Sequence, residues 1–146
     1  MSAPDAIDVI EFRESPDALD GLTEDELEGG FFEGWPNPPT PERHLRHLRG
    51  CEAVGLAVDE ATGDVIGFIS VLGDGFSVAF ISLLEVLPAS RGQGIGTELM
   101  RRMLDRLKDR AAIDLVCDED VVPFYQRVGG TPGPAMLWRR RSVDPL

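Results

Sequence analysis

The sequence predicts one α/β domain over residues 1–146, with helices packed against a single mixed sheet. Two observations carry this prediction. Apolar side chains alternate between strand and helix periods in the order β-α-α-β-β-β-α-β-α-β, and no stretch resembles a linker between two cores. A chain of 146 residues that is 42% hydrophobic and 27% charged also has the size and composition of one ordinary globular domain.

The first third of the chain is predicted to hold one strand and two short helices. Residues 7–12 alternate polar and apolar side chains, as a half-buried strand does. A threonine followed three residues later by a glutamate forms a capping-box pattern and opens a helix over residues 23–32. Thr40 can cap a second helix over residues 41–50, which begins with proline and ends with glycine.

The middle of the chain is predicted to form three consecutive strands. Residues 53–58 and 65–72 flank a polar turn that contains a glycine, which is the pattern of a hairpin. Residues 76–87 are almost wholly apolar, as expected of a central strand covered on both faces. Pro88 ends this strand.

The last third is predicted to alternate helices and strands. Apolar residues recur every four positions over residues 93–109, with basic residues on the other side, so this is the strongest helix signal in the chain. A strand over 112–117 and a short helix over 121–128 follow, and Gly129-Gly130 closes that helix. Residues 135–140 can return as a last strand.

Charge and composition narrow the classes of function. The net charge is −12, and residues 1–35 hold eleven of the 26 acidic residues against Arg13 alone. Such a field repels nucleic acid and anionic lipid and attracts cations, although a solvated acidic face that aids solubility explains the same pattern. The N-terminus lacks a signal-peptide pattern and no stretch reaches membrane-spanning length, so we expect a cytoplasmic protein without a membrane partner.

Cysteine and histidine spacing indicates neither a disulfide framework nor a metal site. Cys51 and Cys117 lie far apart without CxxC spacing, and Cys117 is interpreted as a buried small residue rather than a nucleophile. His44 and His47 are three residues apart on a predicted helix. Without a third ligand they are interpreted as surface or lip residues.

A glycine-rich segment, Arg91-Gly92-Gln93-Gly94-Ile95-Gly96, lies between the long strand and the strongest helix. It places backbone N–H groups at a helix N-terminus, where they suit a phosphate. It is neither a Walker A loop nor a dinucleotide fingerprint, because no Gly-Lys-Ser/Thr follows and Thr97 replaces the third glycine. By itself the segment fits a tight strand-to-helix turn equally well.

The segment does not stand alone, because residues 84–96 resemble the acyl-CoA motif of the GNAT N-acetyltransferase superfamily. Its pattern is Gln/Arg-x-x-Gly-x-Gly/Ala, and its fixed places are filled here by Arg91, Gly94 and Gly96. Phe124-Tyr125 before Gly129 resembles a later signature of that family. The resemblance covers roughly residues 7–130.

The resemblance implies a fold and a co-substrate. The fold is a central mixed, mostly antiparallel sheet of about six to seven strands flanked by about four helices. The co-substrate is acetyl-CoA, whose pantetheine amides pair with strand backbone and whose pyrophosphate is held by the glycine segment. The implied cofactor-binding residues are Glu85, Val86, Arg91, Gly92, Gln93, Gly94, Ile95, Gly96 and Thr97.

Catalytic roles are predicted partly from the resemblance and partly from chemistry. Tyr125, the only tyrosine, occupies the place that in many family members protonates the leaving thiolate. Glu85 is the one ionisable group within the long apolar strand, so its raised pKa suits a base, with Asp114 and Asp118 as weaker candidates. Trp35 precedes a proline-rich loop in the region that shapes the acceptor pocket in this family.

Two hypotheses of different classes remain open. The leading one is transfer of acetyl from acetyl-CoA to a primary amine, with the acidic N-terminal third favouring a cationic small molecule or peptide end. The alternative is a non-catalytic acyl-CoA-binding regulatory module, since Asp118 replaces a common asparagine and Gly130 departs from the usual Gly-Phe or Gly-aliphatic pair. We allow for a homodimer in either case.

Overall fold

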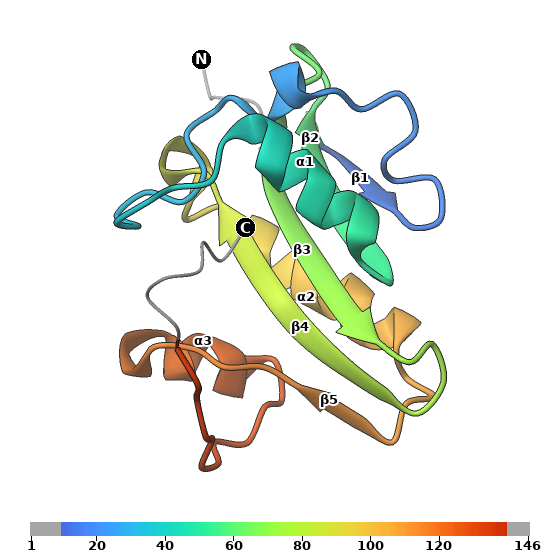
Figure 1. The fold of residues 1–146 in the computed structure, drawn as a ribbon, viewed down its shortest axis with the longest axis vertical. Coiled ribbons are helices and arrows are strands. Elements are labelled where there is room, and N and C mark those ends of the chain that lie inside the picture. The colour runs from blue at the N-terminus through green and yellow to red at the C-terminus, as the bar shows by residue number, and fades with distance from the viewer. Residues whose placement is uncertain (1–9, 140–146) are drawn as a thin grey trace.

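The computed structural model describes residues 10–139 and has one five-stranded sheet in the order β1-β2-β3-β4-β5 (Figure 1). Neighbouring strands pair antiparallel, except that β4 and β5 are parallel. This is the mixed, mostly antiparallel α/β sheet that the sequence predicts. The strands are β1 Ile10–Glu14, β2 Ala53–Asp59, β3 Val65–Gly73, β4 Val78–Val86 and β5 Ala112–Asp114.

Two helices pack on opposite faces of this sheet (Figure 1). They are α1 (Pro41–Gly50) and α2 (Ile95–Arg106), and a shorter helix, α3 (Val122–Arg127), follows β5. The predicted cap of α1 is confirmed, because the Thr40 hydroxyl accepts a hydrogen bond from the Arg43 N–H at 3.2 Å. Three turns of 3-10 helix complete the described chain: η2 Glu24–Leu27, η3 Pro88–Ser90 and η4 Glu119–Val121.

The sheet separates two apolar clusters, which define an α1 face and an α2 face. On the α2 face, Leu99 and Met103 of α2 pack with Ile69 and Ile81 of the sheet. On the α1 face, Leu45 and Leu48 of α1 pack with strand residues and with the loop that precedes the helix. That α1-face cluster includes Phe31, Phe32, Val54, Leu56 and Phe68.

Two sequence-based predictions about β4 and the C-terminus are wrong. The start of β4 is not covered on both faces, since Val78 is 48% and Phe80 39% exposed. The α1-face cluster reaches Leu83 but not the start of the strand. Residues 135–139 form no strand, because they follow Thr-Pro-Gly-Pro, in which two prolines lack backbone donors.

Element lengths also differ from prediction. The helix predicted over residues 23–32 is a single 3-10 turn that ends at Leu27. Gly30 (φ 95°) and Phe32 (φ 67°) have positive φ angles, which are incompatible with a right-handed helix over the rest of the range. The strand predicted over 112–117 ends at Asp114. The described residues therefore contain five strands and three α-helices, fewer than expected. The start of the first predicted strand, residues 7–9, lies outside the described residues.

Candidate active site

The strand β4 has an open edge where β5 turns away from it. The two strands pair only from Val78↔Ala112 to Phe80↔Asp114, whereas β4 continues to Val86 beside β3 (Figure 1). Residues 81–86 are therefore unpaired on the β5 side within the described part of the chain, and we call them the open edge. Exposed strand backbone of this kind can hydrogen-bond an extended amide-containing ligand.

A β-bulge lies at the start of the open edge. The register with β3 shifts between Ser70↔Leu83 and Val71↔Ile81, which leaves Ser82 as the extra residue of β4. Such a bulge bends a strand and increases its twist. The bend coincides with the place where β4 and β5 separate.

The glycine segment follows the open edge after one 3-10 turn, η3. Gly92 (φ 81°) and Gly94 (φ 79°) adopt left-handed conformations, and Gly94 is the N-cap of α2 without a side-chain capping bond. The N–H groups at the start of an α-helix have no partner within that helix. This start of α2 therefore offers backbone donors and the positive end of the helix dipole to an anion.

The side chain of Arg91 folds back toward the end of β4. Its Nε donates to the Val86 carbonyl at 3.1 Å, and its guanidinium lies 3.9 Å from the Glu33 carboxylate. The side chain thereby ties the segment to the end of the open edge. Both charged groups are solvent-exposed, so this ion pair adds little to stability.

Glu85 points to the α1 face of the open edge. Its carboxylate accepts a hydrogen bond from the Phe32 N–H at 2.6 Å. Burial raises the pKa of Glu85, while this hydrogen bond and the charge of Arg91 act in the opposite direction. A carboxylate that is half-buried and held in place by one donor is suited to accept a proton.

Tyr125 lies toward the other face of β4. It packs against the α2-face cluster together with Phe124, whose ring centroid is 5.0 Å from its own. Burial raises the pKa of Tyr125, and the nearby Cys117 adds to the effect. The phenol is therefore protonated at neutral pH and can donate a proton. The structure thus places Glu85 and Tyr125 on opposite faces of the strand.

The structure explains why a glycine occupies position 130. The Gly130 N–H donates to the Tyr125 carbonyl at 2.9 Å, which closes the C-terminus of α3. A Cβ at this position would lie 3.0 Å from that oxygen, so a larger residue would push against the helix end. A glycine at position 130, where the family usually has a phenylalanine or an aliphatic residue, is therefore compatible with an ordered α3 and its Tyr125.

Trp35 lies beside Phe32, the residue whose N–H donates to Glu85. Its indole packs edge-on against the Phe32 ring with centroids 5.0 Å apart, and the backbone N–H of Trp35 donates to the Phe32 carbonyl at 3.1 Å. It is half-buried at the rim of the α1-face cluster. This position leaves part of the indole available to a ligand.

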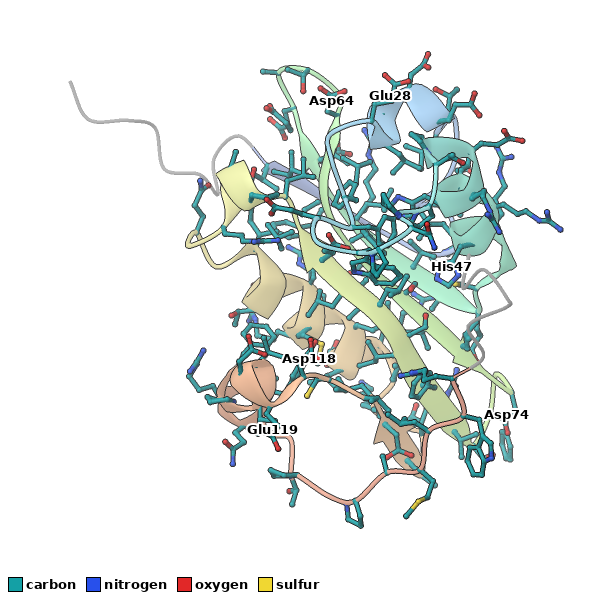
Figure 2. The ribbon with its side chains drawn as sticks, turned by 60° about the vertical axis from the view of Figure 1, so that its left-hand side comes forward. Glu28, His47, Asp64, Asp74, Asp118 and Glu119 are labelled. Atoms are coloured by element: carbon teal, nitrogen blue, oxygen red, sulfur yellow. The ribbon has the colours of Figure 1, made fainter. Side chains whose placement is uncertain are left out.

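The interpretation of the two histidines as surface residues is wrong for His44. It is 1% exposed, and its ring lies 4.4 Å from Phe68, 4.9 Å from Phe32 and 5.3 Å from Phe31, between centroids. His47, labelled in Figure 2, is half-buried, and its Nε2 lies 3.1 Å from the Ser70 hydroxyl. Helical spacing alone could have indicated that His44 shares a side of α1 with Leu45 and Leu48.

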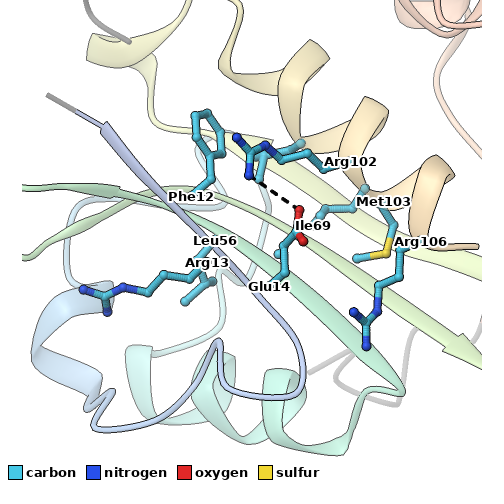
Figure 3. A pocket seen from close by; sticks show the side chains of 10 residues that line it. Phe12, Arg13, Glu14, Leu56, Ile69, Arg102, Met103 and Arg106 are labelled. Carbon is cyan, nitrogen blue, oxygen red and sulfur yellow. Dashed lines mark ion pairs between the residues drawn. The ribbon is translucent and has the colours of Figure 1, made fainter. Parts of the chain in front are cut away.

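Two hollows near α2 do not form an enclosed site. One lies between β1 and α2, where Glu14 and Arg102 form an ion pair of 3.7 Å, and its volume of about 10 Å³ suits no more than a water molecule (Figure 3). The other, of about 410 Å³, borders Gln93, Gly94 and Ile95, but its far wall begins at Ile10, the first described residue. The open edge remains the better candidate.

Within residues 10–139, no cluster of three His, Cys, Asp or Glu side chains could hold a metal ion. No helix of the same stretch is long and apolar enough to cross a membrane.

The open edge and the glycine segment lie within a stretch of the chain that a family model matches. The model of the Acetyltransferase (GNAT) family matches residues 21–130. The chain belongs to this family. The resemblance to this family and the α/β fold class that it implies are therefore confirmed.

Individual family members differ in how much of them is matched. A crystal structure of a candidate acetyltransferase from Deinococcus radiodurans R1 is 48% identical, with a TM-score of 0.84, over 90% of this chain and 89% of that one. The N-alpha-acetyltransferase 30 of Schizosaccharomyces pombe is 36% identical over 55 residues, which cover 34% of this chain. The matches to curated relatives span 37% and 40% of those relatives' own lengths.

A more distant structure shares the fold. The aminoglycoside N-acetyltransferase AAC(6')-Iy, solved in complex with CoA, is 17% identical with a TM-score of 0.62, over 90% of this chain and 95% of that one.

Proposed function

We propose that this protein transfers the acetyl group of acetyl-CoA directly to a primary amine. The observation that carries the proposal is the open edge of β4 followed, after one 3-10 turn, by the glycine segment. An open strand edge supplies donors and acceptors for the amides of a pantetheine arm, and a helix start supplies donors for a pyrophosphate. The family to which the chain belongs uses acetyl-CoA.

The proposed binding residues divide between these two features. Glu85 and Val86 offer the strand backbone for the arm. The phosphate groups would be held by the N–H groups of the glycine segment and the first turn of α2, where Gly94 and Gly96 leave room for close approach. The residues involved are Arg91, Gly92, Gln93, Gly94, Ile95, Gly96 and Thr97.

Two side chains are proposed to move protons. The Glu85 carboxylate takes a proton from the acceptor ammonium, and the resulting amine forms its N–C bond as the C–S bond breaks. The Tyr125 phenol, which is protonated at neutral pH, donates its proton to the departing thiolate. Because the two groups approach β4 from opposite faces, Glu85 can take a proton from the ammonium while Tyr125 donates one to the thiolate.

The acceptor is proposed to be cationic. Acidic residues dominate the N-terminal third, and the segment before α1 carries Glu24, Asp25 and Glu26 in one exposed 3-10 turn. A negative field of this kind raises the local concentration of cations near Trp35 and Glu85. Polyamines, amino sugars and basic peptide ends are the chemical classes that this field favours.

A two-stage experiment tests the proposal. Acetyl-CoA at 100 times its dissociation constant should stabilise the protein by about 2.7 kcal/mol in a thermal-shift assay. Thiol release is then measured with spermidine, glucosamine and a lysine-rich peptide with a free α-amine. No thermal shift would exclude the proposed site, and a shift without turnover on any amine would favour a non-catalytic acyl-CoA-binding module.

A Tyr125→Phe variant tests the proposed proton donor. It keeps the packing against Phe124 and removes only the hydroxyl, so kcat should fall about 10- to 100-fold while the thermal shift with acetyl-CoA is kept. Undiminished turnover would remove Tyr125 from the mechanism.

A further inference from the structure

A chain of three polar side chains connects α1 to the open edge of β4. The His47 Nε2 lies 3.1 Å from the Ser70 Oγ, which lies 2.8 Å from the Ser82 Oγ. Ser70 is fully buried, whereas His47 and Ser82 at the two ends are half-buried. We call these three residues the polar chain; Figure 2 shows His47 where α1 meets the sheet.

The polar chain ends at the bulge. Ser82 is the extra residue of β4, and its hydroxyl points to the α1 face, toward Ser70. It lies two positions beyond Phe80, the last residue paired with β5, and three positions before Glu85. Ser82 is therefore on the same face of the open edge as the carboxylate proposed to bind the acceptor amine.

Acetyl transfer to an ammonium releases two protons from nitrogen. The first leaves before attack, since a protonated amine has no lone pair. After the N–C bond forms, the nitrogen carries one proton more than an amide can keep, and this second proton needs an acceptor of its own. Glu85 still holds the first proton at that moment, unless it has already released it to solvent.

We propose that the polar chain accepts this second proton, with His47 as its final acceptor. The proposal rests on the proposed function. The nitrogen gives its proton to the Ser82 Oγ, Ser82 gives its own to the Ser70 Oγ, and Ser70 gives its own to the His47 Nε2. His47 and Glu85 each return one proton to solvent, Tyr125 regains one, and the net release is one proton for each acetyl group transferred.

The surroundings of His47 suit this role. Burial lowers its pKa, so the imidazole is neutral at pH 7 and free to accept a proton. The titratable groups beside it are the Cys51 thiol, whose sulfur is 3.6 Å from Nε2, and His44 one turn earlier on α1. Burial raises the pKa of Cys51, and its thiol donates to the His47 carbonyl at 3.2 Å, so it stays neutral. The strands β3 and β4 contribute uncharged hydroxyls.

The tautomer of His47 can be tested without any substrate. The chain has two histidines, so ¹⁵N NMR of the imidazoles gives two sets of signals, which His47→Gln distinguishes. The proposal requires a neutral ring at pH 7.5 with the proton on Nδ1 and an accepting Nε2. A proton on Nε2 in the unmodified protein would overturn it, because Ser70 could then not donate to that nitrogen.

Kinetics test the function of the polar chain. With the panel amine that gives turnover, Ser82→Ala and His47→Gln should each lower kcat about 10- to 100-fold and leave the KM for acetyl-CoA unchanged. Ser82→Thr keeps a hydroxyl on a residue that strands favour and should restore most of the rate. Ser77→Ala, in the turn before β4, is the matched control.

The pH profile separates this inference from the proposed function. In the unmodified protein kcat should fall as pH drops through the lowered pKa of His47, and His47→Gln should lose that limb while keeping the limb due to Glu85. Unchanged kcat and pH profiles in both Ser82→Ala and His47→Gln would overturn the proposed role of the polar chain and leave the proposed transferase activity intact. Absence of any acetyl-CoA shift would overturn both.

Discussion

The two faces of the sheet differ sharply in chemistry around β4. On the α2 face, the buried side chains are apolar and hold α2 and its glycine segment against the strands. On the α1 face, polar groups lie among the apolar ones: His44, His47, Ser70, Ser82 and Glu85. In the proposed function, the α2 face supports the binding segment, and the α1 face contributes the groups that act on the acceptor.

Glu85→Gln should produce the largest change in rate. The amide oxygen can still accept from the Phe32 N–H, so the fold should be kept, but the side chain can no longer take a proton. We expect kcat to fall about 10²- to 10⁴-fold. Urea unfolding should show no loss of stability at pH 7, because the substitution removes a partly buried charge whose pKa burial raises.

Glu33→Gln is the matched control for this prediction. Glu33 is an exposed acid two positions before Trp35 and 3.9 Å from Arg91, but it makes no contact with the Phe32 N–H that holds Glu85. Its kcat should stay within about twofold of the unmodified protein. A similar loss of rate in both variants would assign the effect to the general negative field and not to Glu85.

On the α2 face, Leu99→Ala should cost stability and leave the chemistry intact. Leu99 is 2% exposed and its methyl groups lie over Gly55 and Gly67 of the sheet. Truncation of such a buried leucine costs about 2–5 kcal/mol of unfolding free energy. Urea unfolding measures the loss, and kcat per folded molecule should be retained. Asp105→Ala, on the exposed side of α2, should change stability by less than about 0.5 kcal/mol.

His44, which is buried on the α1 face, should make the free energy of unfolding decrease at acidic pH. Burial and the nearby His47 lower the pKa of His44 to about 4, well below the value of 6.5 expected when unfolded. The unfolded chain therefore binds more protons between these values, so stability is complete above about pH 6.5 and falls as pH decreases. The loss by pH 4 should be about 3 kcal/mol.

Replacement of His44 isolates its contribution. In urea unfolding at pH 7.5 and at pH 4, His44→Leu should lose about 3 kcal/mol less than the unmodified protein over the same interval. Its side chain would sit among the rings of Phe31, Phe32 and Phe68 without a polar atom. His47→Gln should keep most of the acid dependence. Equal losses in all three proteins would mean that carboxylates, not His44, control acid unfolding.

Sequence patterns predicted the main helix on each face, but not the polar contacts of the α1 face. The four-residue apolar repeat of α2 and the glycine segment depend on neighbouring residues, and both were found where expected. The polar chain joins residues 12 and 23 positions apart through a bulge, and no local pattern announces such a register shift. His44 was misread because helical spacing shows which residues share a face, but not that three phenylalanines would enclose it.

The strand count was overestimated for a related reason. Residues 135–140 were predicted to return as a last strand, but a strand needs a neighbour with a matching edge, and β5 is only three residues long. The pairing of β5 with β4 ends at Phe80↔Asp114, so β5 ends where the two strands separate. Long-range pairing therefore decided two elements that local propensity could not.

Two glycines at the start of α2 give the smallest expected effects on stability. Gly94 has a φ of 79°, so Gly94→Ala forces a side chain into a left-handed conformation at a cost of about 1 kcal/mol. Gly96 lies within α2, where a Cβ would be 3.6 Å from the Phe124 ring, an ordinary contact. Gly96→Ala should therefore keep or slightly raise stability, because alanine is the better helix former.

Acetyl-CoA binding then distinguishes a structural role of these glycines from a binding role. If the segment holds the pyrophosphate, the methyl group of Gly96→Ala should weaken the acetyl-CoA thermal shift although the protein is as stable as before. Gly94→Ala should weaken both. A Gly96→Ala protein with an undiminished acetyl-CoA shift would mean that Gly96 serves only the packing between α2 and α3, so that the anion contacts the segment elsewhere.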